Sequence, residues 1–127
     1  MRKTAAGAIA CVILLAGCGS SAPAQPSARS LALKVPGCSH PQAAAPSVYA
    51  REEVTCTTPY ASVDVATFST QGDERSWLVS LGRQGGSECI QGSRWAAGVM
   101  ADRIPTNPAS VKVARALGGR LVSAGWC

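Results

Sequence analysis

The sequence predicts a small single domain of the α+β class, with short antiparallel strands, two helices and two disulfides. Three observations support this fold class. Short segments with β-branched residues at alternate positions predict strands, and two segments with helical periodicity between caps predict helices. Residues 19–127 contain four cysteines, an even number, which predicts disulfides. A domain of this size has a small core, so we expect covalent cross-links to stabilise it.

Residues 1–17 have the organisation of an export signal. Arg2 and Lys3 give a positive start, an apolar run follows, and small residues come before Cys18. The uncharged stretch of residues 4–18 has about fifteen residues, whereas a membrane-spanning helix needs about twenty. We therefore expect the segment to be removed as a signal peptide.

Residues 15–18 (LAGC) resemble the lipobox of bacterial lipoproteins. The resemblance implies that Gly17 is the last residue removed and that Cys18 becomes the new amino terminus. It also implies that the Cys18 thiol carries a diacylglyceryl group, which palmitate labelling would report. Several acyl chains give stable anchoring, so the mature chain is expected on the extracytoplasmic face of the cell membrane.

Residues 18–30 are predicted to be the lipidated cysteine and a flexible linker. The stretch GSSAPAQPSARS is rich in Ser, Ala and Pro and has no apolar periodicity, so it cannot bury enough surface to offset its ordering entropy. We expect the folded domain to begin between Leu31 and Cys38, which makes residues 31–127 the domain.

Two neighbouring strands are predicted first. Residues 53–57 (EVTCT) and 61–68 (ASVDVATF) alternate β-branched and other residues, and residues 58–60 form the turn between them. The region around Tyr49 is compatible with a short helical turn.

A helix is predicted to follow, with Thr70 as its amino-terminal cap and Asp73 three residues later. Arg75 and Arg83 can reach solvent, and Gly85–Gly86 ends the helix. Its apolar face comprises Trp77, Leu78 and Leu81.

The second half repeats this order. Residues 88–91 (ECIQ) and 94–100 (RWAAGVM) are strand candidates joined by Gly92–Ser93, a two-residue hairpin connection. Asn107–Pro108 predicts the start of a second helix, and Gly118–Gly119 its end. The apolar residues of this helix are Val113, Ala114 and Leu117.

Four cysteines remain for the folded domain, namely Cys38, Cys56, Cys89 and Cys127. In an exported chain they predict two disulfides, and the sequence allows three pairings. We favour Cys38 with Cys56 and Cys89 with Cys127, because each bond closes a moderate loop within one half of the domain. No C-x-x-C is present and His40 is the only histidine, so we expect neither a metal site nor a cofactor.

A second resemblance extends over residues 38–99. A cysteine, a strand ending in VATF, a helix with arginine and tryptophan, and then CIQGSRWAAGV resemble a pattern in small exported lipoproteins of actinobacteria. Abundant Ala, Gly, Arg and Val agree with a GC-rich genome. The resemblance supports the fold and implies no catalytic or binding residues.

The motifs of common enzymes are missing from the sequence. His40 has no G-x-S-x-G or similar setting, and the acidic pairs Glu52–Glu53 and Asp73–Glu74 are typical of a solvated surface and a helix first turn. The glycines of residues 82–86 follow a helix, whereas a phosphate loop opens one. We therefore expect that the protein is not an enzyme.

The charge is basic but spread out. Removal of Arg2 and Lys3 leaves ten basic residues against seven acids, a formal charge of +3, and no dense basic block occurs. Export also argues against a nucleic-acid partner. We expect a binding module at the cell envelope, whose partner is an envelope protein or a wall polymer. The alternative is a small envelope hydrolase or accessory enzyme that uses His40 with an acid.

Overall fold

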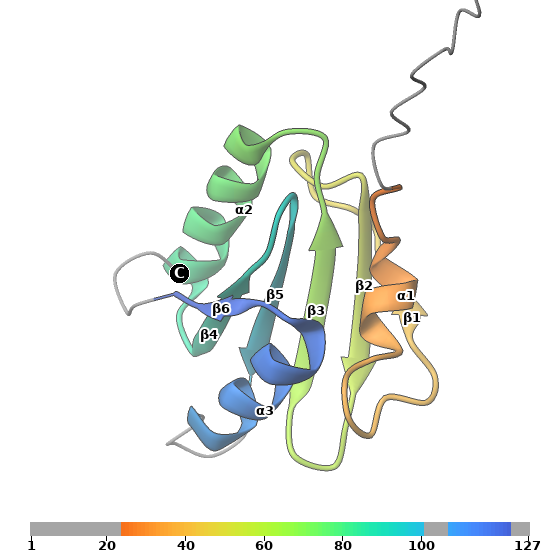
Figure 1. The fold of residues 1–127 in the computed structure, drawn as a ribbon. Helices are drawn as coiled ribbons and strands as arrows, with labels where there is room; N and C mark the ends of the chain where they lie inside the picture. The colour runs from red at the N-terminus through yellow and green to blue at the C-terminus, as the bar shows by residue number, and fades with distance from the viewer. Residues whose placement is uncertain (1–23, 101–106, 123–127) are drawn as a thin grey trace, which may run out of the picture.

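The computed structural model describes residues 24–100 and 107–122. Within these residues the chain forms three helices and one antiparallel sheet of six strands in the order β1-β2-β3-β5-β4-β6 (Figure 1). The predicted α+β class is confirmed. Gly17, Cys18 and Cys127, on which the lipid anchor and one disulfide were predicted, lie outside the described residues.

The first predicted hairpin is confirmed. Strand β2 (Glu52–Thr57) pairs with β3 (Ser62–Thr67), with Cys56 opposite Val63. Alternation puts apolar residues such as Cys56 and Val63 on one face of the sheet, while Thr55 and Asp64 occupy the other face. The Thr58 hydroxyl closes the turn, because it donates to the Ala61 carbonyl at 2.8 Å and accepts from the Ala61 N–H at 3.0 Å.

The second hairpin consists of β4 (Ser87–Gln91) and β5 (Trp95–Met100), and β5 pairs with β3. Here the prediction of a two-residue turn was wrong, since residues 92–94 connect the strands and Arg94 has a left-handed φ of 58°. The ring of Trp95 explains the glycine in this turn. A Cβ atom on Gly92 would lie 1.9 Å from the Trp95 ring, so only glycine allows this approach.

Helix α2 (Gln71–Gln84) begins and ends as predicted. The Thr70 hydroxyl accepts a hydrogen bond from the Asp73 N–H at 3.1 Å, and Gly85, with a φ of 71°, follows the last turn. The buried face of the helix packs on the sheet, and the ring of Trp77 lies 5.7 Å from that of Phe68. The predicted apolar residues Trp77, Leu78 and Leu81 are all buried.

Helix α1 (Ala28–Ala32) was not predicted and corrects the start of the domain. Ser27 caps the helix, and its hydroxyl accepts from the Ser30 N–H at 3.1 Å. Apolar residues at positions i, i+3, i+4 and i+7 then pack against the sheet, and Ala28 is completely buried. The folded domain therefore starts before Leu31, within the predicted linker. These buried residues are Ala28, Leu31, Ala32 and Val35.

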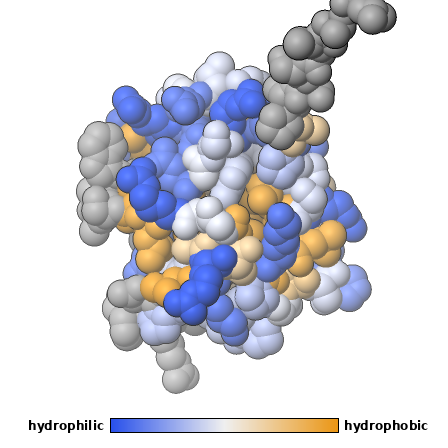
Figure 2. All heavy atoms as spheres, in the orientation of Figure 1, coloured by the Kyte–Doolittle hydropathy of each residue, from blue (hydrophilic) through white to orange (hydrophobic). Residues whose placement is uncertain are grey.

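The helices lie on both faces of the sheet (Figure 1). Helices α1 and α3 (Asn107–Leu117) cover one face, and α2 covers β4 and β5 on the other. Figure 2 views the face of α1 and α3, where apolar side chains reach the surface among hydrophilic ones. Leu33, just after α1, and Val111, in α3, are both exposed. The predicted α3 residues Val113, Ala114 and Leu117 are buried.

Two short strands at the edges were also not predicted. Strand β1 (Gln42–Ala43) pairs with β2, and β6 (Arg120–Leu121) pairs with β4. Each has two residues, which is too short to show the alternation that identifies a strand in a sequence. Between β1 and β2 the chain forms a turn at residues 48–49, as expected near Tyr49.

The disulfide between Cys38 and Cys56 confirms one of the two favoured pairings. Cys89 is buried and is disulfide-bonded, so it is not a free thiol. Its pairing with Cys127 stays a prediction. Among the described residues no group of His, Cys, Asp and Glu could hold a metal ion, and none of the described helices is long and apolar enough to cross a membrane.

Replacement of both Cys38 and Cys56 by alanine is expected to lower the free energy of unfolding by about 3 kcal/mol, because the bond closes a loop with a sequence separation of 18 residues. Urea unfolding followed by circular dichroism measures the change. A loss below about 1 kcal/mol would show that this bond contributes little to stability.

Candidate functional site

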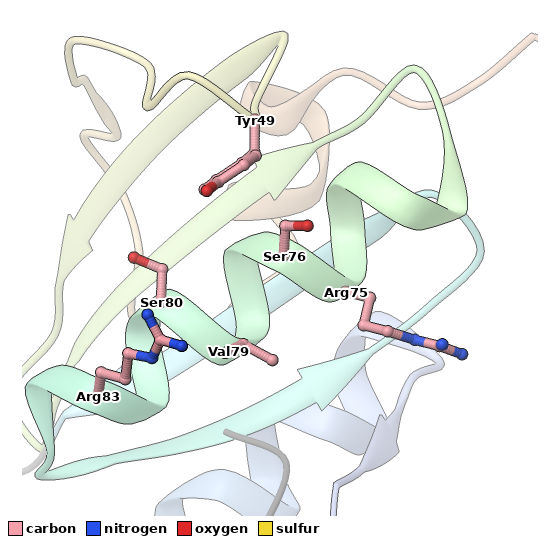
Figure 3. A pocket seen from close by; sticks show the side chains of 6 residues that line it. All are labelled: Tyr49, Arg75, Ser76, Val79, Ser80 and Arg83. Atoms are coloured by element: carbon pink, nitrogen blue, oxygen red, sulfur yellow. The ribbon is translucent and has the colours of Figure 1, made fainter.

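A hollow of about 330 Å³ lies between α2 and the loop that leads into β2 (Figure 3). We call it the Tyr49 groove. Its lining consists of Tyr49, Arg75, Ser76, Val79, Ser80 and Arg83. No carboxylate and no imidazole is part of this lining.

One stripe of α2 forms one wall of the groove. Val79 and Ser80 lie three and four positions after Ser76, and Arg83 lies four and three positions after Val79 and Ser80, so all four share one side of the helix. In Figure 3 the hydroxyl groups of Ser76 and Ser80 and the guanidinium of Arg83 rise on the side of Tyr49.

The loop with Tyr49 forms the opposite wall and is held by backbone hydrogen bonds. The Ser47 N–H donates to the Glu53 carboxylate at 3.0 Å, and the Arg51 N–H donates to the Thr67 carbonyl at 2.8 Å. Ala50 packs against the apolar cluster beneath α2. These contacts hold the loop at both ends and so fix the position of Tyr49. Of the surface of Tyr49, 37% is exposed.

Two positively charged side chains line the groove, and neither has an ion-pair partner among the described residues. Arg75 and Arg83 are exposed, and neither forms a hydrogen bond or an ion pair with any residue that the structure describes. Guanidinium groups bind carboxylates and phosphates through paired N–H donors, and an aromatic ring such as that of Tyr49 offers a flat apolar surface. The groove is therefore suited to a ligand with a ring and an anionic group.

Glu74 lies on the buried side of the same helix. It lies in the first turn of α2, as the sequence predicted, and it is only 1% exposed. One carboxylate oxygen, Oε2, accepts from the Arg94 N–H at 2.9 Å, and Oε1 has no hydrogen-bond partner among the described atoms. Burial raises the pKa of this carboxyl above its ordinary value, although hydrogen bonds from Gln91 and from the Arg94 backbone oppose the shift.

Tyr60 joins the turn after β2 to the helical layer. Its hydroxyl donates to the Pro36 carbonyl, and the ammonium of Lys112 lies 4.8 Å from the centre of its ring. Burial raises the pKa of the Tyr60 hydroxyl, and a side-chain hydrogen bond with Thr58 opposes this. These contacts hold α3 and the chain around Pro36 together, and they lie outside the Tyr49 groove.

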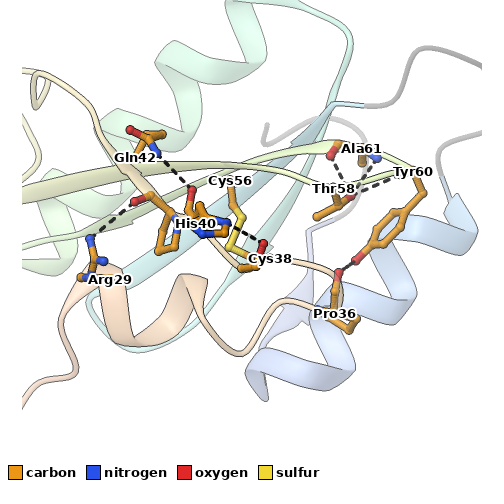
Figure 4. The surroundings of a disulfide bond; sticks show 11 residues. Arg29, Pro36, Cys38, His40, Gln42, Cys56, Thr58, Tyr60 and Ala61 are labelled. Atoms are coloured by element: carbon orange, nitrogen blue, oxygen red, sulfur yellow. Dashed lines mark hydrogen bonds between the residues drawn. A yellow bond between two sulfur atoms is a disulfide. The ribbon is translucent and has the colours of Figure 1, made fainter.

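His40, the candidate for the alternative enzymatic role, lies outside the groove in the loop between Cys38 and β1 (Figure 4). Its side chain is exposed, and its Nδ1 is 2.9 Å from the hydroxyl of the neighbouring Ser39. Among the described residues no carboxylate hydrogen-bonds to the ring. The Ser39 contact therefore joins sequence neighbours in an exposed loop.

The structure brings together Cys38 and Cys56 and buries Cys89, which is also disulfide-bonded, while Gly17, Cys18 and Cys127 lie outside its described part. The sequence analysis missed the Tyr49 groove. The signal was the polar stripe of α2, where serines and arginines follow the spacing of one helix side, but nothing in the sequence placed Tyr49 opposite that stripe. No protein-family profile, curated protein or solved structure matches this chain.

The raised pKa of Glu74 predicts a pH-dependent stability. Because the folded state binds this proton more tightly than the unfolded state, its contribution is fully present below the unfolded pKa and is lost as the pH rises through the folded pKa. Glu74→Gln keeps an acceptor for Arg94 and carries no charge. We expect the variant to gain stability relative to the wild type as the pH rises from about 4 to 8.

Urea unfolding at a series of pH values measures this difference, with Glu88→Gln as the control for removal of one carboxylate from a partly exposed position. A difference between Glu74→Gln and the wild type that stays constant over this pH range, or that changes in the opposite direction, would contradict the assignment.

Proposed function

We propose that the chain is an exported domain, held at the extracytoplasmic face of the cell membrane by lipid on Cys18, that binds an anionic saccharide of the cell envelope in the Tyr49 groove. The proposed location at the membrane is based on the export signal and on residues 15–18 (LAGC). The proposed activity is binding without catalysis.

One observation carries the choice of ligand. The groove combines an exposed aromatic ring, the hydroxyls of Ser76 and Ser80, and two arginines that no described residue neutralises. A sugar ring can stack on Tyr49, its hydroxyls can exchange hydrogen bonds with the serines, and a carboxylate or phosphate can pair with a guanidinium. Wall polymers with charged sugars carry these groups together.

A hydrolase that uses His40 is the second candidate, and the contact between Ser39 and His40 is the observation in its favour. A serine activated by a histidine needs a third group that orients the imidazole and a protected place for the substrate. The exposed loop of His40 offers neither among the described residues. We therefore favour binding in the groove.

Isothermal titration calorimetry of the full chain in detergent, with oligogalacturonate as the anionic probe and a neutral maltooligosaccharide of equal length, tests the proposal. We expect binding of the anionic probe and weaker or undetectable binding of the neutral one. Arg83→Gln is expected to weaken binding about tenfold, because a charge-assisted hydrogen bond is lost.

Arg115→Gln is the matched control. Arg83 and Arg115 are both exposed arginines in the last turn of a helix, so both variants lose the same charge and the same favourable contact with the helix dipole. Only Arg83 lines the groove. Equal affinities of the two variants, or no binding of oligogalacturonate by the wild type, would contradict the proposal.

A further inference from the structure

The point where the chain enters the domain is fixed by hydrogen bonds. The side-chain amide of Gln25 donates to the carbonyls of Phe68 at 3.0 Å and Arg94 at 2.7 Å. Three residues later the Ala28 N–H donates to a Glu52 carboxylate oxygen at 2.8 Å. The chain therefore enters at the end of the sheet where β2 begins and β3 ends, which is the upper end in Figure 1, where α2 also starts.

The surface around this entry point has exposed cations and an exposed apolar tip. Arg51 lies just after Tyr49 and before β2, and the Arg51 N–H donates to the Thr67 carbonyl at the end of β3. Arg94 lies in the turn between β4 and β5, which Gln25 contacts. Both side chains are exposed, and neither guanidinium bonds to a described residue. Val48, next to Tyr49 in the loop, is 93% exposed. We call Val48, Arg51 and Arg94 the entry face.

Carboxylates at this end of the domain are occupied by donors of the protein itself. Glu52 accepts from the Ala28 N–H, Glu53 from the Ser47 N–H, and Asp73 from the Thr70 hydroxyl. Glu74 is buried. Each of the first three carboxylates keeps its negative charge, because a hydrogen bond from a neutral donor does not remove it, but the bond holds the group against the domain. The guanidinium groups of Arg51 and Arg94 have no such bond to a described residue, so they are the charged groups that can reach toward an outside partner, and anionic groups on that partner suit them.

The short connection to Cys18 indicates which partner this is. Seven peptide units separate Cys18 from Gln25, and an extended chain of this length reaches at most about 25 Å. The linker predicted from the sequence, which extended to residue 30, would have allowed a greater distance. If Cys18 is lipidated, the entry face is the part of the domain that is held nearest to the bilayer.

We propose that the entry face rests on an anionic lipid surface, with Arg51 and Arg94 at the headgroups and Val48 at the boundary with the acyl chains. This inference depends on the proposed lipid anchor at Cys18. The anchor supplies proximity, the arginines supply attraction to anionic headgroups, and the exposed valine supplies apolar contact. The contact fixes the orientation of the domain and places the Tyr49 groove, formed in part by the same loop, beside the membrane.

The test uses the full chain, acylated in cells and reconstituted into nanodiscs whose headgroups carry a gadolinium chelate. Amide NMR signals lose intensity according to their distance from the headgroups. In nanodiscs of phosphatidylcholine and phosphatidylglycerol we expect strong attenuation at Val48, Arg51 and Arg94. We expect weak attenuation at His40, just before β1, and at Gly86, just before β4, because both strands begin toward the other end of the sheet.

The double variant Arg51→Gln/Arg94→Gln is expected to lower the population in this orientation about 25-fold relative to released orientations, because each arginine contributes about a factor of five at an anionic surface. Lys34→Gln/Arg115→Gln removes the same charge from exposed positions outside the entry face, and it is expected to leave the pattern unchanged.

The measurements distinguish a failure of the proposed lipid anchor from a failure of the proposed membrane contact. Equal incorporation of labelled palmitate by the wild type and by Cys18→Ser would refute the anchor, and the membrane contact with it. An acylated protein with equal attenuation at Val48 and His40 would overturn the contact alone. The same pattern in nanodiscs of phosphatidylcholine only, or equal effects of the two double variants, would overturn the assignment of an anionic surface.

Discussion

Hydrogen bonds between three polar side chains and backbone groups at one end of the sheet hold the layers of this domain together. Gln25 donates to the backbone of Phe68 and Arg94, and Glu52 accepts from the first residue of α1. From inside α2, Glu74 accepts from the Arg94 N–H. The turn at Arg94 is thereby tied to helices on both faces of the sheet. Because these partners are backbone groups, the hydrogen bonds hold the backbone of the turn and of α1 in place. They add to the packing of the side chains.

Both functional proposals depend on this end of the sheet. The position of α2, which Glu74 ties to the second hairpin, sets the distance between its polar stripe and Tyr49. The hydrogen bonds of Gln25 and Ala28 determine where the chain enters, and hence which surface lies nearest to Cys18. Burial of Glu74 is unfavourable for the ionised carboxylate, because one of its oxygens has no hydrogen-bond partner among the described atoms. The carboxyl therefore resists ionisation.

Local patterns in the sequence predicted the elements with clear signals, such as the Thr70 cap, the glycines after α2 and the pairing of Cys38 with Cys56. Helix α1 also had a signal, a serine cap followed by apolar residues at helical spacing, but the surrounding Ser, Ala and Pro favoured a linker. The left-handed Arg94 and the burial of Glu74 depend on each other across 20 residues. Local reasoning cannot find such a contact, and the Tyr49 groove was missed for the same reason.

Native-state hydrogen exchange at the backbone amide of Ala28, followed by NMR in the full chain, tests the central constraint most directly. If the bond to Glu52 and the burial of α1 make this segment part of the folded domain, the Ala28 amide exchanges only through global unfolding. Its free energy of opening then lies within about 1 kcal/mol of the global value. Exchange at the rate of an unstructured peptide would show that the domain begins later, and would contradict the account.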